Sequence, residues 1–444
     1  MNAEGTSIKT AAESALANTF AKAQGHLPGD KAVAAQRATA FGVFAKQGLP
    51  NRRIEEWKYT DLRALMREAK PLASPPDAAA KAHAMTAGRM LGDVEVRRLT
   101  FVDGAFVPEL SDLKGLESGL SIGSLADALA AGNPAVLANL GKIAPSGDVA
   151  VALNTAFMGD GAVINIGGGA TIERPLHLCF VATQKPAATF VRSLVTAAPG
   201  TRAMLIESHE GPADSDYQVN AALELFVGER AHIDHVKITA DGADALHVST
   251  LAAAIAAQAR FNTFGFTMGG AVVRNQMFLN FDGEDTVGGI RGVTLLGGHQ
   301  HADTTLFVNH IARGCQSREV FKSVLGGEAH GVFQGRIVVR RGGQKTDAKM
   351  MTQALLLSER AEADNKPELE IYADDVQCGH GATAGALDDE LKFYLMARGI
   401  PAAEAEALLI QAFLGEAIEG IEHAGLREAL TDCVVGWLKA RGGR

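Results

Sequence analysis

Two side chains able to bind a metal or attack an electrophile, Cys378 and His380, stand two positions apart in DDVQCGHGATAGALDDELKFYLMARGIP, residues 374–401. In an extended segment, positions i and i+2 point to the same side, so the thiol and the imidazole would address one ion or one acceptor together. A thiolate beside an imidazole suits iron, zinc or an iron–sulfur unit. The other interpretations are a nucleophile with its base, or a buried cysteine near a histidine that only caps a turn.

The pair is too small to be a closed metal site. Zinc sites and iron–sulfur clusters usually have about four protein ligands. The missing ligands would have to come from Asp374, Asp375, a distant part of the chain or another polypeptide. The spacing alone leaves these sources open.

A second group of candidate ligands is formed by histidines around GGHQHADTTLFVNH, namely His299, His301 and His310, with His330 further on. The spacing of the first two resembles that of cupin-type metal sites. Two threonines follow them, however, where the cupin pattern needs a glutamate. A cupin-like metal enzyme and ordinary surface or turn histidines are both compatible with this pattern.

The sequence contains weaker signals for other classes of enzyme. Lys345 and Asp347, in GGQKTDA, are candidates for proton transfer, as in a solenoid-type polysaccharide lyase or hydrolase. Such an enzyme needs carboxylates grouped along one groove, and the acidic residues of the middle region are scattered. The GQKTD segment lacks the GxxxxGK[ST] frame of a phosphate-binding loop, so we expect no nucleotide to be bound by this chain.

Composition excludes several kinds of partner. The formal net charge of -9 argues against a nucleic-acid surface, which needs a clustered basic face. The four cysteines form no CxxC pair, which favours a reducing compartment. The first residues do not resemble a signal peptide, and the most apolar window, near Leu251, is too short to span a bilayer. We expect a soluble cytoplasmic protein with no membrane partner.

Residues 1–148 are predicted to form a mainly helical N-terminal domain. The expected elements are helices over Ile8–Ala23 and Lys31–Gln47, a hairpin at Asp103-Gly104 and a short helix capped by Ser124. The segment EEWKYTDL holds Trp57, which we expect to pack as a strut on the body of the protein or to mark an interface.

Residues 149–362 are predicted to be a β core. Short apolar runs follow one another, and a weak phrase recurs at the turns: GTRAML, GERAHI, AQARFN, GEDTVG and GEAHGV. A loose period in the twenties with small residues at corners favours the stacked coils of a β-solenoid. A sandwich of antiparallel strands is the alternative.

Residues 363–444 are predicted to be a C-terminal helical domain. Gly399 ends one helix and Pro401 lies at the first turn of the next. The second helix carries an apolar row at i+4 spacing, formed by Leu409, Phe413, Ala417 and Ile421. Three helices attached to a β body favour a docking appendage.

The run from Phe321 to Ile400 resembles the SufB/SufD family, the scaffold pair of the SUF iron–sulfur cluster assembly machinery. The most specific part is IYADDVQCGHGATAGALDDELKFYLMARGI, and ALNTAFMGDG, HADTTLFVNH and EEWKYTDL support it in the other regions. The DDVxCxHGATxGxLDDExxFYLxxRGI form and the chain length are most similar to the SufD version of the family.

The resemblance implies a right-handed parallel β-helix core flanked by N- and C-terminal helical domains. It also implies a SufB-like paralogue, paired through the ends of the two β-helices, and a SufC-like ATPase docked on the C-terminal helices. A homodimer of the free chain is left open. The residues expected to bind the ATPase are Phe393, Tyr394, Arg398, Leu409 and Phe413.

The same resemblance gives Cys378 and His380 a role. It implies that the pair lies at the interface with the SufB-like subunit, where His380 helps to hold a nascent iron–sulfur cluster or iron. The partner would supply the missing thiolate and carboxylate ligands, and ATPase dimerisation would strain the interface open. The expected function is thus a non-catalytic scaffold subunit for cluster assembly, and the alternative is a β-helix carbohydrate-active lyase or hydrolase.

Overall fold

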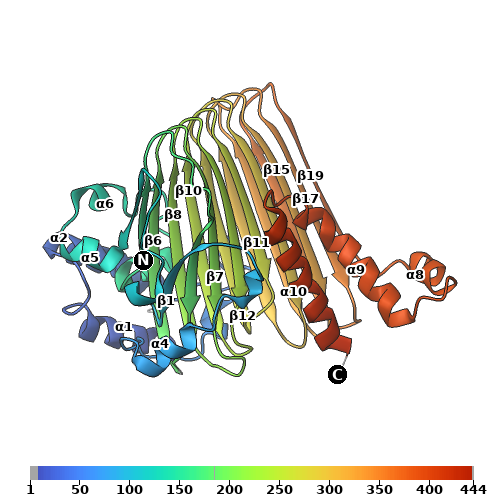
Figure 1. The fold of residues 1–444 in the computed structure, drawn as a ribbon, viewed down its shortest axis with the longest axis horizontal. Helices are drawn as coiled ribbons and strands as arrows, with labels where there is room; N and C mark the ends of the chain where they lie inside the picture. Colours follow the sequence, from blue (N-terminus) through green and yellow to red (C-terminus); the bar gives the residue numbers. More distant parts are fainter. Residues whose placement is uncertain (1–8, 185, 443–444) are drawn as a thin grey trace, which may run out of the picture.

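The centre of the protein is a coil of about eight turns with helices at both ends, as Figure 1 shows. The computed structural model describes residues 9–184 and 186–442. From β4 onward, neighbouring strands within each sheet lie two apart in chain order, because every turn gives one strand to each of two facing sheets. The strands of successive turns pair in parallel. The predicted β-solenoid is therefore confirmed, and the antiparallel sandwich is wrong.

We name the two sheets by their size. Sheet I is ten-stranded and consists of β1 (Arg97–Val102), β2 (Ala105–Phe106), β5 (Leu176–Val181), β7 (Arg202–Glu210), β9 (His232–Ala240), β11 (Arg260–Thr267), β13 (Val287–Leu296), β15 (Gln316–Leu325), β17 (Asp347–Leu356) and β19 (Gln377–Gly385). Sheet II is nine-stranded and consists of β3 (Leu120–Ser124), β4 (Ala162–Ile166), β6 (Ala188–Ala197), β8 (Gln218–Val227), β10 (Leu246–Ile255), β12 (Val272–Phe281), β14 (His301–His310), β16 (His330–Val339) and β18 (Glu362–Ile371).

Inward-facing side chains stack in columns, because the strands of successive turns pair in register. One column runs through four turns of sheet II, from Leu223 through Leu251 and Met277 to Leu306, and all four side chains are buried. Burying an aliphatic side chain of this size contributes about 1.5–3 kcal/mol. The stacked columns are the main hydrophobic core.

The recurring phrase in the sequence marks one corner of the coil. Gly200, Arg230, Gln258 and Asp285 occupy this corner in four successive turns, and all have positive φ, between 53° and 69°. The backbone N–H of each donates to a carbonyl at the same corner of the next turn, for example Arg230 to Ala257. This bond offsets the cost of about 1–2 kcal/mol for a left-handed residue other than glycine. The fifth phrase, at Gly327, lies at the opposite corner, between β15 and β16, which explains its irregular spacing.

The N-terminal region wraps the first end of the coil. Its helices are α1 (Ala11–Ala23), α2 (Lys31–Gln47), α3 (Leu62–Leu65), α4 (Ala78–Ala84), α5 (Leu125–Ala130), α6 (Pro134–Asn139) and α7 (Val149–Phe157), with short 3-10 turns at Glu55–Trp57, Arg89–Leu91 and Pro108–Leu110. The two long helices and the helix capped by Ser124 are confirmed. Ile8, the predicted start of the first helix, lies outside the described residues.

The predicted hairpin at Asp103-Gly104 is confirmed and joins β1 to β2. Both turn residues have positive φ, 50° and 84°, as the tight turns that suit a hairpin require. Strand β1 also pairs in parallel with β5. The hairpin therefore belongs to sheet I and is continuous with the coil.

A buried ion pair fastens the segment around Trp57 to the outer face of sheet II. Trp57 is buried, and the Arg274 guanidinium carbon lies 4.1 Å from the centroid of its ring. Arg274 forms an ion pair with Asp303, its in-register neighbour on the next turn, and donates to the Glu56 carbonyl at 2.7 Å. Thr60 Oγ1 donates to the same Asp303 carboxylate at 2.5 Å. Trp57 thus packs as the strut that the sequence suggested.

The C-terminal helices are α8 (Asp389–Met396), α9 (Ala402–Ile418) and α10 (Ala424–Gly442). The second and third cover the outer face of sheet I, where Ile410 and Leu414 of α9 pack in one cluster with Val293 and Val324. Helix α8 projects beyond the coil at the right of Figure 1.

The boundary predicted at residue 362 lies too early. The coil continues through β18 and β19 to Gly385, so residues 363–385 belong to it and not to the helical domain. The reason is compositional, because EADNKPELEI and QCGHGATAG lack the apolar alternation of an interior turn. At the other boundary, the segment that starts at Val149 begins with α7 before the first strand of the coil.

We predict that Arg274→Ala destabilises the protein by about 3–5 kcal/mol, because it leaves Asp303 buried without its partner. Urea unfolding followed by circular dichroism measures the change. Arg340→Ala removes an exposed arginine that directly follows β16 and is the matched control. The second substitution Asp303→Asn should recover part of the loss, and equal unfolding midpoints for Arg274→Ala and Arg340→Ala would contradict the prediction.

Candidate functional site

Cys378 and His380 lie on β19, the last strand of sheet I, and both continue inward-facing columns of the coil. Cys378 pairs in register with Ala348 and His380 with Met350. Both partners are buried in the interior cluster, so the two side chains above them share the inward side of the strand. Cys378 is half-buried and packs against that cluster, whereas His380 is exposed. The thiol and the imidazole therefore lie together at the end of the interior.

That end of the coil is open. Within the described chain, β18 and β19 are the outermost strands of their sheets, each with one hydrogen-bonded neighbour. None of the residues of these two strands, all of which the structure describes, is buried. At the opposite end, the interior is covered by apolar side chains of the N-terminal region: Phe106, Leu113, Leu116 and Ile122. We call β18 and β19 the open end.

The surroundings of Cys378 favour the protonated thiol. Partial burial raises the pKa of this thiol above its ordinary value, and the carboxylates of Asp347 and Glu319 raise it further. A metal ion binds the thiolate and must displace this proton. Cys378 is therefore a thiol in the free chain, and a metal ion would have to displace its proton to bind it.

Sequence reasoning missed a buried carboxyl group in the same column. Ile290, Glu319, Met350 and His380 pair in register on four successive turns, and Glu319 is fully buried. Neither of its carboxylate oxygens has a hydrogen-bond partner among the described residues. Burial raises the pKa of Glu319 to about 7. The alternation of Ser317, Glu319 and Phe321 is the only signal in the sequence, and it identifies an inward face only once the register is known.

The acidic residues before β19 are engaged elsewhere or exposed. Asp375 forms an ion pair with Lys345 at the corner that precedes β19, and Asp374 is exposed. Asp347 pairs with Arg318 at 2.5 Å. Lys345 and Asp347 therefore have separate partners, and they do not form the proton-transfer pair that a lyase or hydrolase would need.

The histidines of the cupin-like pattern do not converge on one point. The His299 side chain is 81% exposed and lies 3.3 Å from Glu328. His301 lies 2.9 Å from Thr60 Oγ1 and 3.2 Å from His330, its in-register neighbour. Burial lowers the pKa of His301 to about 4. These two side chains belong to the network that anchors the segment around Trp57, and not to a shared ion site.

The fourth histidine of that pattern, His310, is buried inside the coil. Its Nε2 atom lies 3.0 Å from Ser317 Oγ, and burial lowers its pKa to about 4. His310 is therefore a neutral core histidine.

One set of three donors lies close together elsewhere. Side-chain atoms of His232, Asp234 and Glu422 lie within 4.8 Å of one another, where the α9–α10 connection meets sheet I. Arg202 and Arg260 approach Glu422 at 3.6 and 3.3 Å. These two positive charges already neutralise the carboxylate and would repel a divalent cation, so the set is better described as an ion-pair cluster.

The residues expected to bind a partner fall into two groups. Phe393 and Tyr394 of α8 are 72% and 53% exposed, and the Arg398 guanidinium lies 3.5 Å from the centroid of the Tyr394 ring. Leu409 is half-buried. Phe413, by contrast, faces the coil, because its ring lies 4.4 Å from the buried Lys322 ammonium and packs in the cluster under α9.

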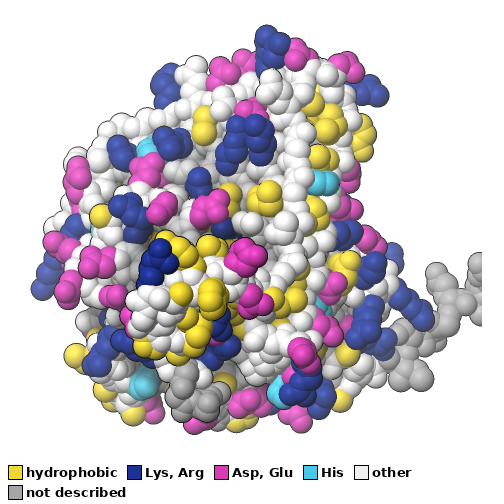
Figure 2. Space-filling view, turned by 90° about the vertical axis from the view of Figure 1, so that its right-hand side faces the viewer, with side chains coloured by type: hydrophobic (Ala, Val, Ile, Leu, Met, Phe, Trp, Pro, Cys, Tyr) yellow, Lys and Arg dark blue, Asp and Glu magenta, His cyan; other side chains and the backbone are white. Residues whose placement is uncertain are grey.

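We define the α8 patch as the exposed apolar residues of α8 and the start of α9: Leu391, Phe393, Tyr394, Met396 and Leu408. No residue of α8 is buried, and all of them are described. Figure 2 views the molecule from the side on which α8 projects and shows hydrophobic side chains gathered in the middle of that face. Contiguous apolar surface of this kind marks an interaction site.

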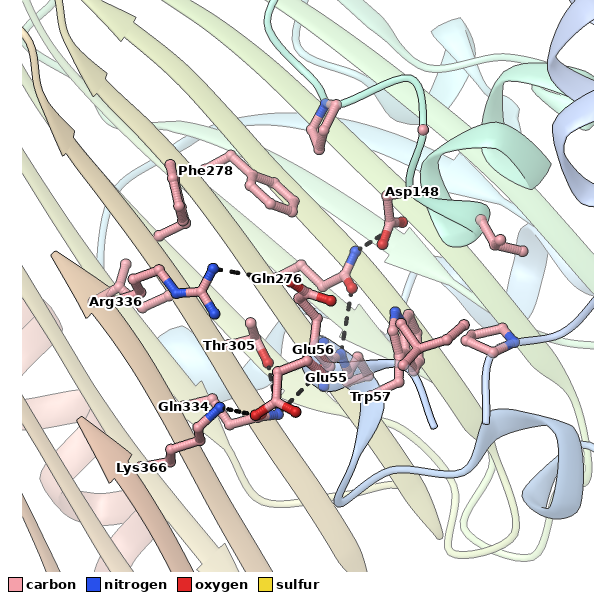
Figure 3. A pocket seen from close by; sticks show the side chains of 18 of the residues that line it. Glu55, Glu56, Trp57, Asp148, Gln276, Phe278, Thr305, Gln334, Arg336 and Lys366 are labelled. Carbon is pink, nitrogen blue, oxygen red and sulfur yellow. Dashed lines mark hydrogen bonds and ion pairs between the residues drawn. The ribbon is translucent and has the colours of Figure 1, made fainter. Parts of the chain in front are cut away.

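A cavity of about 390 Å³ lies on the outer face of sheet II, under the segment around Trp57, and reaches Lys366 and Glu368 of β18. Figure 3 shows its polar lining on sheet II. A bilayer-crossing helix, long and apolar throughout, is absent from the described part of the chain.

Comparison with known proteins identifies a family for most of the chain. Residues 180–413 match the family model described as SUF system FeS cluster assembly, SufBD core domain, and residues 12–178 match the SufBD protein N-terminal region. An iron-sulfur cluster assembly SufBD family protein of Synechocystis is 32% identical over 91% of both chains. The iron-sulfur cluster assembly protein SufD of Escherichia coli is 30% identical over 86% of this chain and 88% of its own length.

Glu319 gives a prediction with a defined sign. Its pKa is about 7 in the folded chain and about 4.5 when exposed, so the folded chain keeps a proton that the unfolded chain releases between these values. The contribution of Glu319 to the free energy of unfolding therefore falls as pH rises through this window, by about 3 kcal/mol. Glu319→Gln, which cannot ionise, should gain about that much relative to the parent chain between pH 4.5 and 8.

Urea unfolding at a series of pH values measures this difference. Glu359→Gln, at an exposed position, is the control and should leave the pH profile unchanged. Parallel profiles for the parent chain and Glu319→Gln would show that the carboxyl group is not held in a water-free interior.

Proposed function

The chain belongs to the SufB/SufD family, and on that premise we propose that it is a non-catalytic scaffold subunit that pairs with a SufB-like paralogue and a SufC-like ATPase. Family membership supports a role in iron–sulfur cluster assembly by the SUF system. The observation that carries the finer proposal is the open end of the coil with Cys378 and His380 on its inward side. The nascent cluster, or its iron, is the cargo of this site.

Pairing at the open end follows from backbone hydrogen bonding. The outermost strands of a sheet expose unpaired N–H and C=O groups, which proteins normally cover or disrupt. Solenoids likewise need a capping element at each end. A second coil of similar cross-section is the cap that fits two parallel edges at once. Such a partner extends both sheets and brings its own interior against Cys378 and His380.

A site shared between two chains would bind a cluster weakly enough for a scaffold to release it. One thiolate and one imidazole fill about half of the usual ligand set, so the partner must supply the remainder. A cluster held by ligands from two chains loses half of them when the chains separate. Opening the interface would therefore be enough to release the cluster, and no competing ligand would be needed.

The α8 patch is the proposed ATPase-binding surface. It includes the exposed aromatic side chains of Phe393 and Tyr394, and Arg398 lies beside it over the Tyr394 ring; aromatic and arginine side chains dominate the energetics of protein interfaces. Helix α9 connects this patch to the coil, where Lys322 of β15 contacts both the Phe413 ring and the Glu416 carboxylate. Movement of the bound ATPase would be transmitted along α9 to sheet I.

We predict that His380→Ala impairs cluster formation on the assembled complex by about 10-fold or more, while folding and ATPase binding stay intact because the side chain is exposed. Iron and sulfide content, with the visible absorbance of the cluster, measure the effect after reconstitution with the two partners. His299→Ala, which also removes an exposed histidine, is the control. Equal cluster yields from the two variants would refute the site assignment.

A second prediction concerns docking. Phe393→Ser should weaken binding of the ATPase subunit by about 2 kcal/mol or more, a roughly 30-fold rise in Kd, because a large exposed aromatic anchor is lost. Surface plasmon resonance with the immobilised ATPase gives the affinity. Met85→Ser removes a similarly exposed apolar side chain from the N-terminal region and should have no effect. Unchanged affinity for Phe393→Ser would move the docking surface elsewhere.

A further inference from the structure

The cavity beside Trp57 has the size and enclosure of a small-ligand site. Its volume of about 390 Å³ lies in the range of roughly 300–1,000 Å³ that is typical for such sites. Three separate parts of the chain enclose it: residues 47–57, residues 145–149 and the outer face of strands β12 to β18 of sheet II. Figure 3 shows these parts converging on one space.

The floor of the cavity is built by register. Two ladders of neighbouring side chains cross four turns, the polar ladder Gln276, Thr305, Gln334 and Lys366, and the mixed ladder Phe278, Phe307, Arg336 and Glu368. The two phenylalanine rings are 6.5 Å apart and form an apolar shelf. The side walls are also largely apolar and include Pro50, Ile54, Pro145 and Val149.

The wall opposite this shelf is fixed before any ligand arrives. Trp57 is only 2% exposed and is held by the Arg274 guanidinium at 4.1 Å from its ring. The charge of Arg274 is already balanced by the buried Asp303. The cavity is therefore preformed, and Arg274 contributes shape to it without offering a free positive charge.

The polar groups at the rim carry an excess of negative charge. Arg336 approaches three carboxylates, those of Glu56, Glu368 and Glu370, at 3.9, 3.2 and 3.5 Å. Lys366 is shared between Glu55 and Glu368. Two positively charged side chains thus form ion pairs with four carboxylates, which leaves an excess of negative charge.

A fifth carboxylate faces the cavity from the other side. Asp148 Oδ1 caps α7 through the Val151 N–H and accepts a hydrogen bond from Gln276 Nε2 at 3.3 Å. In a partly enclosed site such an imbalance attracts a positive ligand and repels an anion.

We propose that this cavity binds an organic cation with an apolar body. The ammonium or guanidinium group lies among the rim carboxylates of Glu56, Asp148 and Glu368, and the apolar body rests on the Phe278–Phe307 shelf, where ring faces also favour a nearby cation. Two sources offer this chemistry: an aromatic–basic side-chain pair in a peptide, and a free aromatic amine. The proposal does not depend on the role of Cys378 and His380.

Isothermal titration of the full chain with three indoles of similar size tests the charge preference: tryptamine, neutral indole-3-ethanol and anionic indole-3-acetate. Tryptamine should bind at least about 10-fold more tightly than the neutral compound, and the anion should not bind measurably. Equal affinity for the three compounds, or no binding by any, would overturn the proposal.

Variants locate the binding. Glu56→Gln and Glu368→Gln should each reduce tryptamine affinity several-fold, whereas Glu362→Gln, an exposed position on the same strand as Glu368, should leave it unchanged. Phe307→Ala should reduce affinity for tryptamine and for the neutral indole alike, because it removes the shelf. If Glu362→Gln weakened binding as much as Glu368→Gln, the overall negative charge of the protein would explain the binding, and the proposed site would be wrong.

A second titration distinguishes the two sources. The peptide N-acetyl-Phe-Arg-amide is compared with N-acetyl-Phe-citrulline-amide, which has the same shape without the charge. Tighter binding of the arginine peptide than of tryptamine identifies a peptide segment as the occupant, and the reverse order identifies a free amine. Equal binding of the arginine and citrulline peptides would contradict the cation preference from a second direction.

Discussion

The rest of the structure depends on one constraint: the backbone hydrogen bonds between successive turns hold equivalent side chains directly above one another. It stacks Leu223, Leu251, Met277 and Leu306 into one column and repeats a left-handed residue at one corner. The same pairing must stop where the chain leaves the coil. Strands β18 and β19 therefore present free edges, and Cys378 and His380 occupy the place where the next turn would have covered them. Core and candidate site are thus two consequences of one pattern of bonds.

The interior of the coil buries polar side chains in its middle turns, such as Glu207, His235 and His247, as well as Glu319 nearer the open end. Glu319 lies two turns below His380 without a hydrogen-bond partner in the described chain, although burying such a group costs several kcal/mol. Because the pKa of Glu319 is about 7, the protonation state of this carboxyl group would respond to a positive charge bound near the Cys378–His380 pair.

Much of this fold could be predicted from the sequence, because local signals were strong. Asp103-Gly104 identified a hairpin, and the loose period of the corner phrase favoured the coil; in the structure these corners hold left-handed residues. The boundary near residue 362 failed because the last turn, facing outward on its free side, lacks an apolar pattern. Glu319 and the cavity beside Trp57 were missed for a different reason. An inward column and a three-sided cavity form only when segments far apart in the sequence are aligned in the fold. The spacing of residues along the chain does not predict that alignment.

The two proposed interfaces are mechanically connected through β15. Helix α9 contacts this strand through Lys322, whose ammonium group meets the Phe413 ring and the Glu416 carboxylate. Strand β15 pairs with β17 over its full length, and β17 pairs with β19. A paired sheet with a close-packed core deforms little, so a pull on α9 displaces these strands together and does not stretch the bonds between them. In the proposed complex, the contact between the open end and the partner would be the weakest junction in this path. Strain applied at the α8 patch would then open that contact, next to Cys378 and His380.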